Sequence, residues 1–100
     1  MIFLPKIIVM CYDLEKIEYQ HDFILKVTFK DGTSGFVDFA KEINSIKPYN
    51  TLNDINLFKS AYIHPELHTL TWSDDLDYDP ILLYYKANNI PFPESWGITA

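Results

Sequence analysis

Four aspartates lie within six residues in the stretch WSDDLDYDP, which covers residues 72–80. Their carboxylates repel one another, because all of them lie within the roughly 8 Å Debye length of physiological salt. A bound metal ion, a basic partner or the folded backbone must therefore compensate the negative charge. Each of these alternatives implies a different kind of site.

A calcium-binding loop is the first alternative, because Asp75, Asp77 and Asp79 alternate along the chain. An EF-hand loop needs glycine at its sixth position and glutamate at its twelfth. Counted from Asp75, these positions hold Pro80 and Lys86. The motif fails at both positions, and we expect no metal site and no cofactor.

Hydrogen bonds from the backbone are the alternative that the sequence favours. Asp79 followed by Pro80 is typical of a helix start, with aspartate as the N-cap and proline at the first helical position. We expect Asp77 and Asp79 to lie beside the free N–H groups and the positive end of this helix. Asp74 and Asp75 would lie in the preceding turn, where aspartate bonds to nearby amides.

The histidines could suggest a zinc site or nucleophilic catalysis, but their sequence context favours neither. His64 and His68 have the separation of zinc ligands on a helix, but Pro65 directly follows the first of them, so the pair brackets a turn. Ser73 shows no signature of a nucleophile elbow or an oxyanion hole. We therefore expect a protein that is not an enzyme, and a metal-dependent hydrolase that combines the aspartates with His64 or His68 ranks last.

The composition limits the classes of partner. The chain of 100 residues has 14 Asp and Glu against 8 Lys and Arg, a formal net charge of −6. Nucleic-acid binding depends on cations that contact phosphates, so we expect no direct contact with nucleic acid. An acidic surface suits a basic protein partner better. Cys11 is the only cysteine, which excludes an internal disulfide and a thiolate metal cluster.

The hydropathy pattern argues against a membrane protein. No stretch approaches the 18 or more apolar residues that a membrane-spanning helix needs. The beginning, MIFLPKIIVMCY, has no basic lead and no small-residue cleavage site, and Pro5 and Lys6 interrupt its apolar run. It therefore does not read as a signal peptide. We expect a cytoplasmic protein that makes no contact with a membrane.

A β-hairpin is the clearest local pattern in the chain. Apolar and polar residues alternate through residues 23–29, which is the period of a half-buried strand. Asp-Gly at residues 31–32 marks a tight turn, and residues 35–39 return as the second strand. The apolar residues 6–12 are too few for a helix and favour a buried strand. Residues 13–20 are ambiguous.

The second half of the chain contains short helices and another hairpin. We predict a brief helix that Thr51 caps and that runs to Phe58, with Asp54 in its first turn. Two short apolar runs around a turn at residues 65–66 predict the second hairpin. The last helix begins at Asp79-Pro80 and ends near residues 88–89.

Together these patterns predict an α+β fold. We expect a single small domain over residues 1–100, with an antiparallel sheet of about four to five strands and two or three short helices. The C-terminal tail, residues 89–100, is rich in aromatic residues. Pro91 and Pro93 restrict their own backbone and that of their predecessors, so the tail should be extended.

The order and spacing of several motifs resemble those of a small bacterial family, domain of unknown function 2442. In that family a strand ending in F-x-D-G precedes a V-D-hydrophobic strand, a leucine and a phenylalanine bracket a short helix, and a tryptophan precedes D-x-x-P-x-x-L-Y. Residues 19–84 form the family-like core. The matching residues here are Phe29, Asp31, Gly32, Val37, Asp38, Phe39, Leu52, Phe58, Trp72, Asp77, Pro80, Leu83 and Tyr84.

The resemblance implies a small α+β domain and no known activity. Similar domains look like accessory modules, of which some precede a DNA-binding helix-turn-helix and others pair with a small neighbouring protein in the manner of toxin–antitoxin systems. This sequence departs from the family at Asp75, where glycine is usual, and in its long aromatic tail.

Aromatic residues are concentrated in the last third of the chain. Most large aromatic residues of a small domain must fill its core, but tyrosine and tryptophan that remain outside it are typical anchors of interfaces. The tail is the element in which we most expect such anchors. The candidate binding residues are Trp72, Asp77, Asp79, Tyr84, Tyr85, Phe92 and Trp96.

The leading hypothesis is a non-catalytic module that acts by protein–protein contact, either as a homodimer or with a small basic partner, in a toxin–antitoxin-like arrangement. Its basis is the acidic charge, the surplus of aromatic residues and a sheet edge open to pairing. The alternative is a small-molecule pocket lined by aromatic residues between the sheet and the last helix, with Asp77 or Tyr84 supplying polar contacts.

Overall fold

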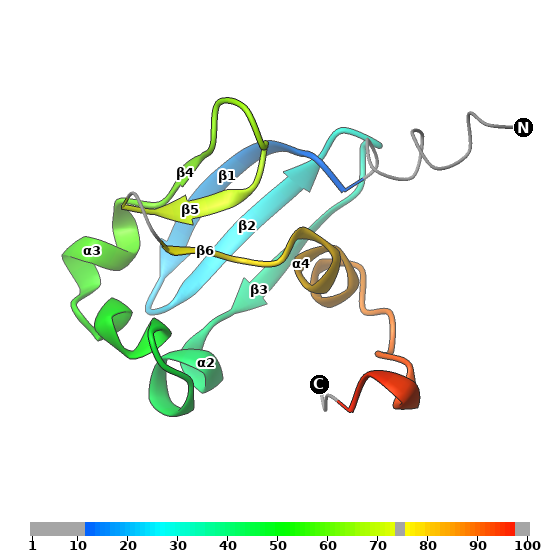
Figure 1. Cartoon of the computed structure of the whole chain (residues 1–100). Coiled ribbons are helices and arrows are strands. Elements are labelled where there is room, and N and C mark those ends of the chain that lie inside the picture. Colours follow the sequence, from blue (N-terminus) through cyan, green and yellow to red (C-terminus); the bar gives the residue numbers. More distant parts are fainter. Residues whose placement is uncertain (1–11, 74–75, 98–100) are drawn as a thin grey trace, which may run out of the picture.

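The computed structural model of the chain describes residues 12–73 and 76–97. Their strands form two antiparallel three-stranded sheets, and short helical segments pack around these sheets (Figure 1). The fold is therefore α+β, as predicted. The predicted strand over residues 6–12 lies outside the described residues except for Tyr12, and so do Asp74 and Asp75.

The first sheet has the order β1–β2–β3, with β1 at Leu14–His21, β2 at Ile24–Phe29 and β3 at Ser34–Asp38. The predicted hairpin of β2 and β3 is confirmed, and the ambiguous stretch before it is β1. Every second residue of β2 is buried, which places Leu25, Val27 and Phe29 on the face that packs against the rest of the molecule.

The turn between β2 and β3 follows from the residues at its centre. The backbone amide of Thr33 donates to Asp31 Oδ1 at 2.9 Å, an interaction that aspartate commonly makes in turns. Gly32 has a φ of 91°, a region that residues with a Cβ rarely adopt. The Asp-Gly pair thus fixes where β2 ends.

The second sheet consists of β4 (Tyr62–Ile63), β5 (Leu70–Trp72) and β6 (Leu76–Asp77). β4 and β5 form the predicted second hairpin. The His64 ring stabilises its loop, because the amides of Glu66 and Leu67 each donate to His64 Nδ1 at 3.1 Å.

The strand arrangement differs from the single sheet of four to five strands that the sequence predicts, because the described residues contain six strands in two sheets. The amide of Leu14 donates to the carbonyl of His68 at 3.0 Å and links the sheets at one point. The strands of the second sheet have only two or three residues and do not continue the ladder of β1; they lie across the face of the first sheet (Figure 1).

Three short helical segments follow β3: α2 (Ala40–Ser45), the 3-10 helix η1 (Tyr49–Asn53) and α3 (Ile55–Lys59). The prediction that Thr51 caps the helix that ends near Phe58 is wrong. Asp54 is the N-cap, because its Oδ1 accepts a bond from the amide of Asn56 at 3.0 Å. Aspartate caps a helix better than threonine, and it lies three residues later than we expected.

The last helix, α4 (Pro80–Ala87), begins where the sequence predicts. Asp79 Oδ1 accepts bonds from the amides of Ile81 at 2.8 Å and Leu82 at 3.2 Å. The sequence predicts an extended tail beyond α4. The chain turns at residues 88–89, has no regular secondary structure at residues 90–93 and then forms a short 3-10 helix, η2 (Glu94–Trp96).

The core lies between the first sheet and the layer formed by the second sheet and α4 (Figure 1). α4 approaches β3 so closely that a Cβ at Gly35 would overlap the carbonyl oxygen of Ala87. Within the part of the chain that the structure describes, no helix has the length and apolar character that crossing a membrane requires. The largest fully buried side chains are Trp72, Phe29, Phe39, Phe58, Leu25, Leu52, Leu70, Leu83 and Val27.

Candidate functional site

The predicted binding residues divide into two groups, and Trp72 and Tyr84 belong to the inner group. Trp72 is 0% exposed, and its indole Nε1 donates to the carbonyl of Phe58 at 2.9 Å. The Tyr84 hydroxyl donates to Asp31 Oδ2 at 2.5 Å, and its ring packs on Phe29 with ring centroids 4.9 Å apart. Both residues stabilise the fold, and we leave them out of the candidate surface.

The outer group contains three aromatic side chains that pack against each other on the outside of α4. The ring centroids of Tyr85 and Trp96 are 5.2 Å apart, and Phe92 lies 6.2 Å from Tyr85 and 6.0 Å from Trp96. Pro91 and Pro93 stiffen the tail and so help to hold it beside the helix. The structure thus brings Tyr85, Phe92 and Trp96 together, which sequence spacing alone does not show.

Two isoleucines extend this aromatic group. Ile81 is 39% exposed and Ile90 is also 39% exposed, like Trp96. Our sequence analysis missed both, although Ile81 and Tyr85 are four residues apart and therefore lie on the same side of a helix. We call Ile81, Leu82, Tyr85, Ile90, Phe92 and Trp96 the α4–tail face.

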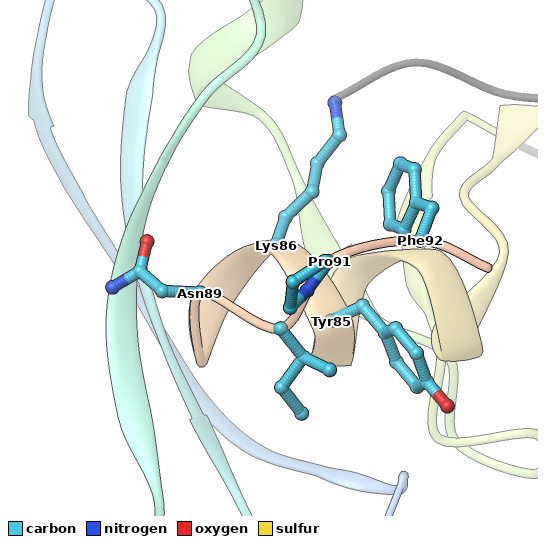
Figure 2. A pocket seen from close by; sticks show the side chains of 6 residues that line it. Tyr85, Lys86, Asn89, Pro91 and Phe92 are labelled. Carbon is cyan, nitrogen blue, oxygen red and sulfur yellow. The ribbon is translucent and has the colours of Figure 1, made fainter. Parts of the chain in front are cut away.

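Two shallow grooves lie on the α4–tail face. The first, here the tail groove, has a volume of about 430 Å³ and is lined by Tyr85, Lys86, Asn89, Ile90, Pro91 and Phe92. Figure 2 shows that the side chains of Tyr85 and Lys86 leave the helix in different directions, with Phe92 on the same side as Lys86. The second, here the Trp96 groove, has a volume of about 410 Å³ and is lined by Asp79, Ile81, Leu82 and Trp96.

Three exposed acidic residues accompany the α4–tail face: Asp77, Asp79 and Glu94. Asp79 caps α4, as expected. Asp77 lies in β6, where its backbone carbonyl accepts a bond from the Tyr49 hydroxyl at 2.8 Å. Burial raises the pKa of Tyr49, and the negative charges of Asp77 and Asp79 raise it further. Of Asp77 and Asp79, only Asp79 accepts hydrogen bonds from backbone amides of the described residues.

A buried polar cluster behind α4 was missed altogether. Glu42, on α2, is 6% exposed, and its Oε2 accepts the Tyr78 hydroxyl at 2.7 Å and pairs with the Lys86 ammonium group. Glu42 Oε1 has no hydrogen-bond partner among the described residues. No signal in the sequence connects Glu42 with Lys86, because the two are 44 residues apart and glutamate is normally exposed.

The environment of this cluster changes the titration of both its partners. Burial lowers the pKa of Lys86, and the positive charge of Lys41 lowers it further, against the opposite effect of Asp38. Burial raises the pKa of Tyr78 well above its usual value, with smaller contributions from Tyr49 and Asp79. Tyr78 therefore remains a neutral donor to the Glu42 carboxylate.

The histidines lie apart from the α4–tail face. His64 holds the β4–β5 loop, and His68 Nδ1 lies 3.4 Å from Asp13 Oδ2. Among residues 12–73 and 76–97, no three side chains of His, Cys, Asp or Glu come together in a way that could hold a metal ion.

The comparisons with known proteins identify a family but no activity. A family model described as "Protein of unknown function (DUF2442)" matches residues 14–89. This match confirms the resemblance that the motifs indicated, and it extends beyond them at both ends. No curated protein and no solved structure matches the chain.

Proposed function

The chain belongs to the DUF2442 family of proteins of unknown function, and from that premise we propose that it is a non-catalytic module that binds another protein through the α4–tail face. We further propose that it acts in the cytoplasm, where it forms a homodimer or a complex with a small basic protein in a toxin–antitoxin-like arrangement. Direct binding of nucleic acid is not part of this proposal.

The observation that carries the proposal is the clustering of apolar side chains on the outside of α4. Ile81, Ile90 and Trp96 are each 39% exposed. Trp96 packs on the half-buried rings of Tyr85 and Phe92, Ile90 lines the tail groove with these two residues, and Ile81 lines the Trp96 groove. Single exposed apolar residues are ordinary, whereas a contiguous group that includes aromatic residues is typical of an interaction site. The fold does not need these side chains for its core, which other residues fill.

The polar surroundings support a protein partner. Asp79 lines the Trp96 groove, and the exposed acidic residues Asp77 and Glu94 lie two residues before Asp79 and Trp96 in the chain. Interfaces commonly combine an apolar centre with a polar rim. A basic partner would be attracted to this rim, and a second acidic copy would be repelled by it.

The test measures complex formation with paired variants. Trp96→Ala and Ile81→Ser remove apolar surface from the α4–tail face, and each should weaken the complex by about tenfold or more. Phe36→Ala is the matched control, because Phe36 is 64% exposed on β3, away from this face. Sedimentation analysis follows self-association, and calorimetry follows binding to any small basic protein that an adjacent gene encodes.

Two results would contradict the proposal. One is a protein that stays monomeric at every concentration and binds none of these gene products. The other is a complex that Phe36→Ala weakens as much as Trp96→Ala does, since the interface would then lie elsewhere or be non-specific.

A small-molecule site is the second candidate, because the two grooves, of about 430 and 410 Å³, fall at the lower end of the volume range of ligand pockets. Both grooves lie on the outside of α4. A thermal-shift screen against metabolites separates the two functions. Stabilisation by a metabolite that Ile90→Ala abolishes would favour the tail groove as a ligand site, and stabilisation by protein alone would exclude it.

A further inference from the structure

We propose that the Trp96 groove binds the side chain of a lysine or arginine that a basic partner protein presents to it. This inference rests on the proposed function and specifies the chemistry of the partner. It starts from the four residues that line the groove: Asp79, Ile81, Leu82 and Trp96.

The lining matches the two parts of a long cationic side chain. Lysine and arginine have an apolar stem that packs on apolar surface and a charged head that stays polar. Ile81 and Leu82 provide aliphatic walls for such a stem, and the Trp96 ring, 39% exposed, is the best aromatic partner for a cation. The Asp79 carboxylate supplies the charge-assisted hydrogen bond that the head requires. A purely apolar ligand would make no hydrogen bond to this carboxylate.

Asp79 can bind a cation without giving up its role in α4. Both amide bonds of the N-cap, from Ile81 and Leu82, go to the same atom, Oδ1. Oδ2 accepts no hydrogen bond from any residue that the structure describes. The carboxylate therefore has one oxygen that caps the helix and one oxygen that is available to a ligand.

The charge distribution around the groove calls for a cation from another molecule. Lys86 is the only lysine between residues 76 and 97, a stretch that has no arginine, and it is paired with Glu42 behind the helix. Asp77, Asp79 and Glu94 form no ion pair with any described residue. The net charge of −6 makes a second copy of this chain a poorer source of the cation than a basic protein.

The test uses two short peptides that differ only in charge. The probe is acetyl-Gly-Arg-Gly-amide, and the control replaces its arginine by citrulline, which has nearly the same shape and no charge. Titration of the isotope-labelled protein is followed by NMR at the methyl groups of Ile81 and Leu82 and the indole N–H of Trp96. The arginine peptide should give saturable shifts at these three residues, with a dissociation constant in the millimolar range that is expected for a single side chain. The citrulline peptide should give none.

Variants separate the contributions of charge and ring. Asp79→Asn keeps the helix cap, because asparagine caps as well as aspartate does, but it removes the charge. It should weaken binding of the arginine peptide by about tenfold, and Trp96→Leu should weaken it by about threefold. Glu94→Gln is the control for a general effect of negative charge, and it should change the affinity by less than about twofold.

Three results would overturn the inference: equal shifts with both peptides, no saturable shift with the arginine peptide, or an affinity that Asp79→Asn leaves unchanged. These outcomes differ from a failure of the proposed function. If the protein complex depends on the α4–tail face while the arginine peptide does not bind, the interface stands and only its cationic contact fails. If the peptide binds as expected but no protein complex forms, the proposed function fails.

Discussion

Glu42 is the residue whose surroundings depart most from what its type predicts. It is 6% exposed, and one of its carboxylate oxygens receives both the Tyr78 hydroxyl and the Lys86 ammonium group. Its second oxygen has no partner in the described part of the chain. A buried carboxylate is tolerated only when its partners compensate the loss of hydration. The cluster therefore links α2 to α4. Removal of any one partner would leave buried polar groups without compensation.

Removing Glu42 alone should destabilise the protein. Glu42→Ala leaves Lys86 as a half-buried charge and Tyr78 as an unpaired buried hydroxyl, and we expect a loss of about 2–3 kcal/mol in the free energy of unfolding. The triple variant Glu42→Leu, Tyr78→Phe, Lys86→Met removes all three polar groups and should regain most of that loss. Urea denaturation measures both. A triple variant less stable than Glu42→Ala would show that the polar cluster is itself stabilising.

Asp31 makes the stability depend on pH. Burial alone would raise the pKa of the Asp31 carboxyl, but hydrogen bonds from the Tyr84 hydroxyl and from Thr33 outweigh it and hold the pKa below 3.8. A carboxyl whose pKa is depressed in the folded state stabilises the fold above its unfolded pKa. This contribution is lost as the pH falls through the folded pKa.

The bond from Tyr84 can be removed without removing its ring. In Tyr84→Phe, the pKa of Asp31 should rise toward 3.8, and the stability that this carboxyl loses on acidification should become smaller. NMR titration of the Asp31 carboxyl measures the change. Tyr62→Phe is the control, because the Tyr62 hydroxyl donates to the Ser73 carbonyl at 3.3 Å instead. An unchanged pKa in Tyr84→Phe would mean that burial and the bonds from Thr33 and the Asp31 backbone set the pKa without Tyr84.

At the scale of elements, the contact between β3 and α4 decides how the helix lies on the sheet. Gly35 has no Cβ, and the Ala87 carbonyl at the end of α4 occupies the space where a Cβ would be. Asn88 Nδ2 donates to Thr33 Oγ1 at 3.3 Å beside this contact. The small residue thus sets the distance between helix and strand.

Gly35→Ala should test this contact directly. The added methyl meets backbone atoms, which cannot move aside as a flexible side chain would, and we expect a loss of about 2 kcal/mol in the free energy of unfolding. Ser34→Ala, at the neighbouring exposed position, should change it by less than about 0.5 kcal/mol. Thermal denaturation gives both values. Equal stability of the two variants would mean that α4 shifts freely on β3.

Local signals explain which elements the sequence could predict. Asp31-Gly32 and Asp79-Pro80 specify a turn and a helix start through interactions within a few residues, and the structure has both. Asp54 caps α3 where we expected Thr51, because both residue types can cap a helix and the residue types alone do not fix where the helix begins.

Contacts between distant residues explain what the sequence could not predict. The division into two sheets depends on how β4 and β5 cross the first sheet, which no local pattern encodes. The Glu42–Lys86 pair joins residues 44 apart. At the candidate site, the tail residues were predicted from their type alone, whereas the grooves exist only because the tail returns to α4.

At the scale of the whole molecule, charge separates the two kinds of complex that we propose. The net charge of −6 attracts a basic partner and opposes self-association. Salt screens both effects, with a Debye length of about 10 Å at 0.1 M ionic strength.

The salt dependence of complex formation therefore identifies the partner class. A complex with a basic protein should form more slowly and bind more weakly as the salt concentration rises, whereas a homodimer should become tighter. Stopped-flow association and sedimentation at increasing sodium chloride concentrations measure these trends. A heterologous complex whose association rate does not respond to salt would contradict the role that we give to the acidic rim.

The two tryptophans occupy opposite environments, since Trp72 is 0% exposed and Trp96 is 39% exposed. Trp72 should therefore give a blue-shifted emission that soluble quenchers do not reach. Trp96 should give a red-shifted emission that they do quench. The first reports on unfolding and the second on occupancy of the outer surface. One unlabelled sample thus carries separate optical probes for stability and for binding.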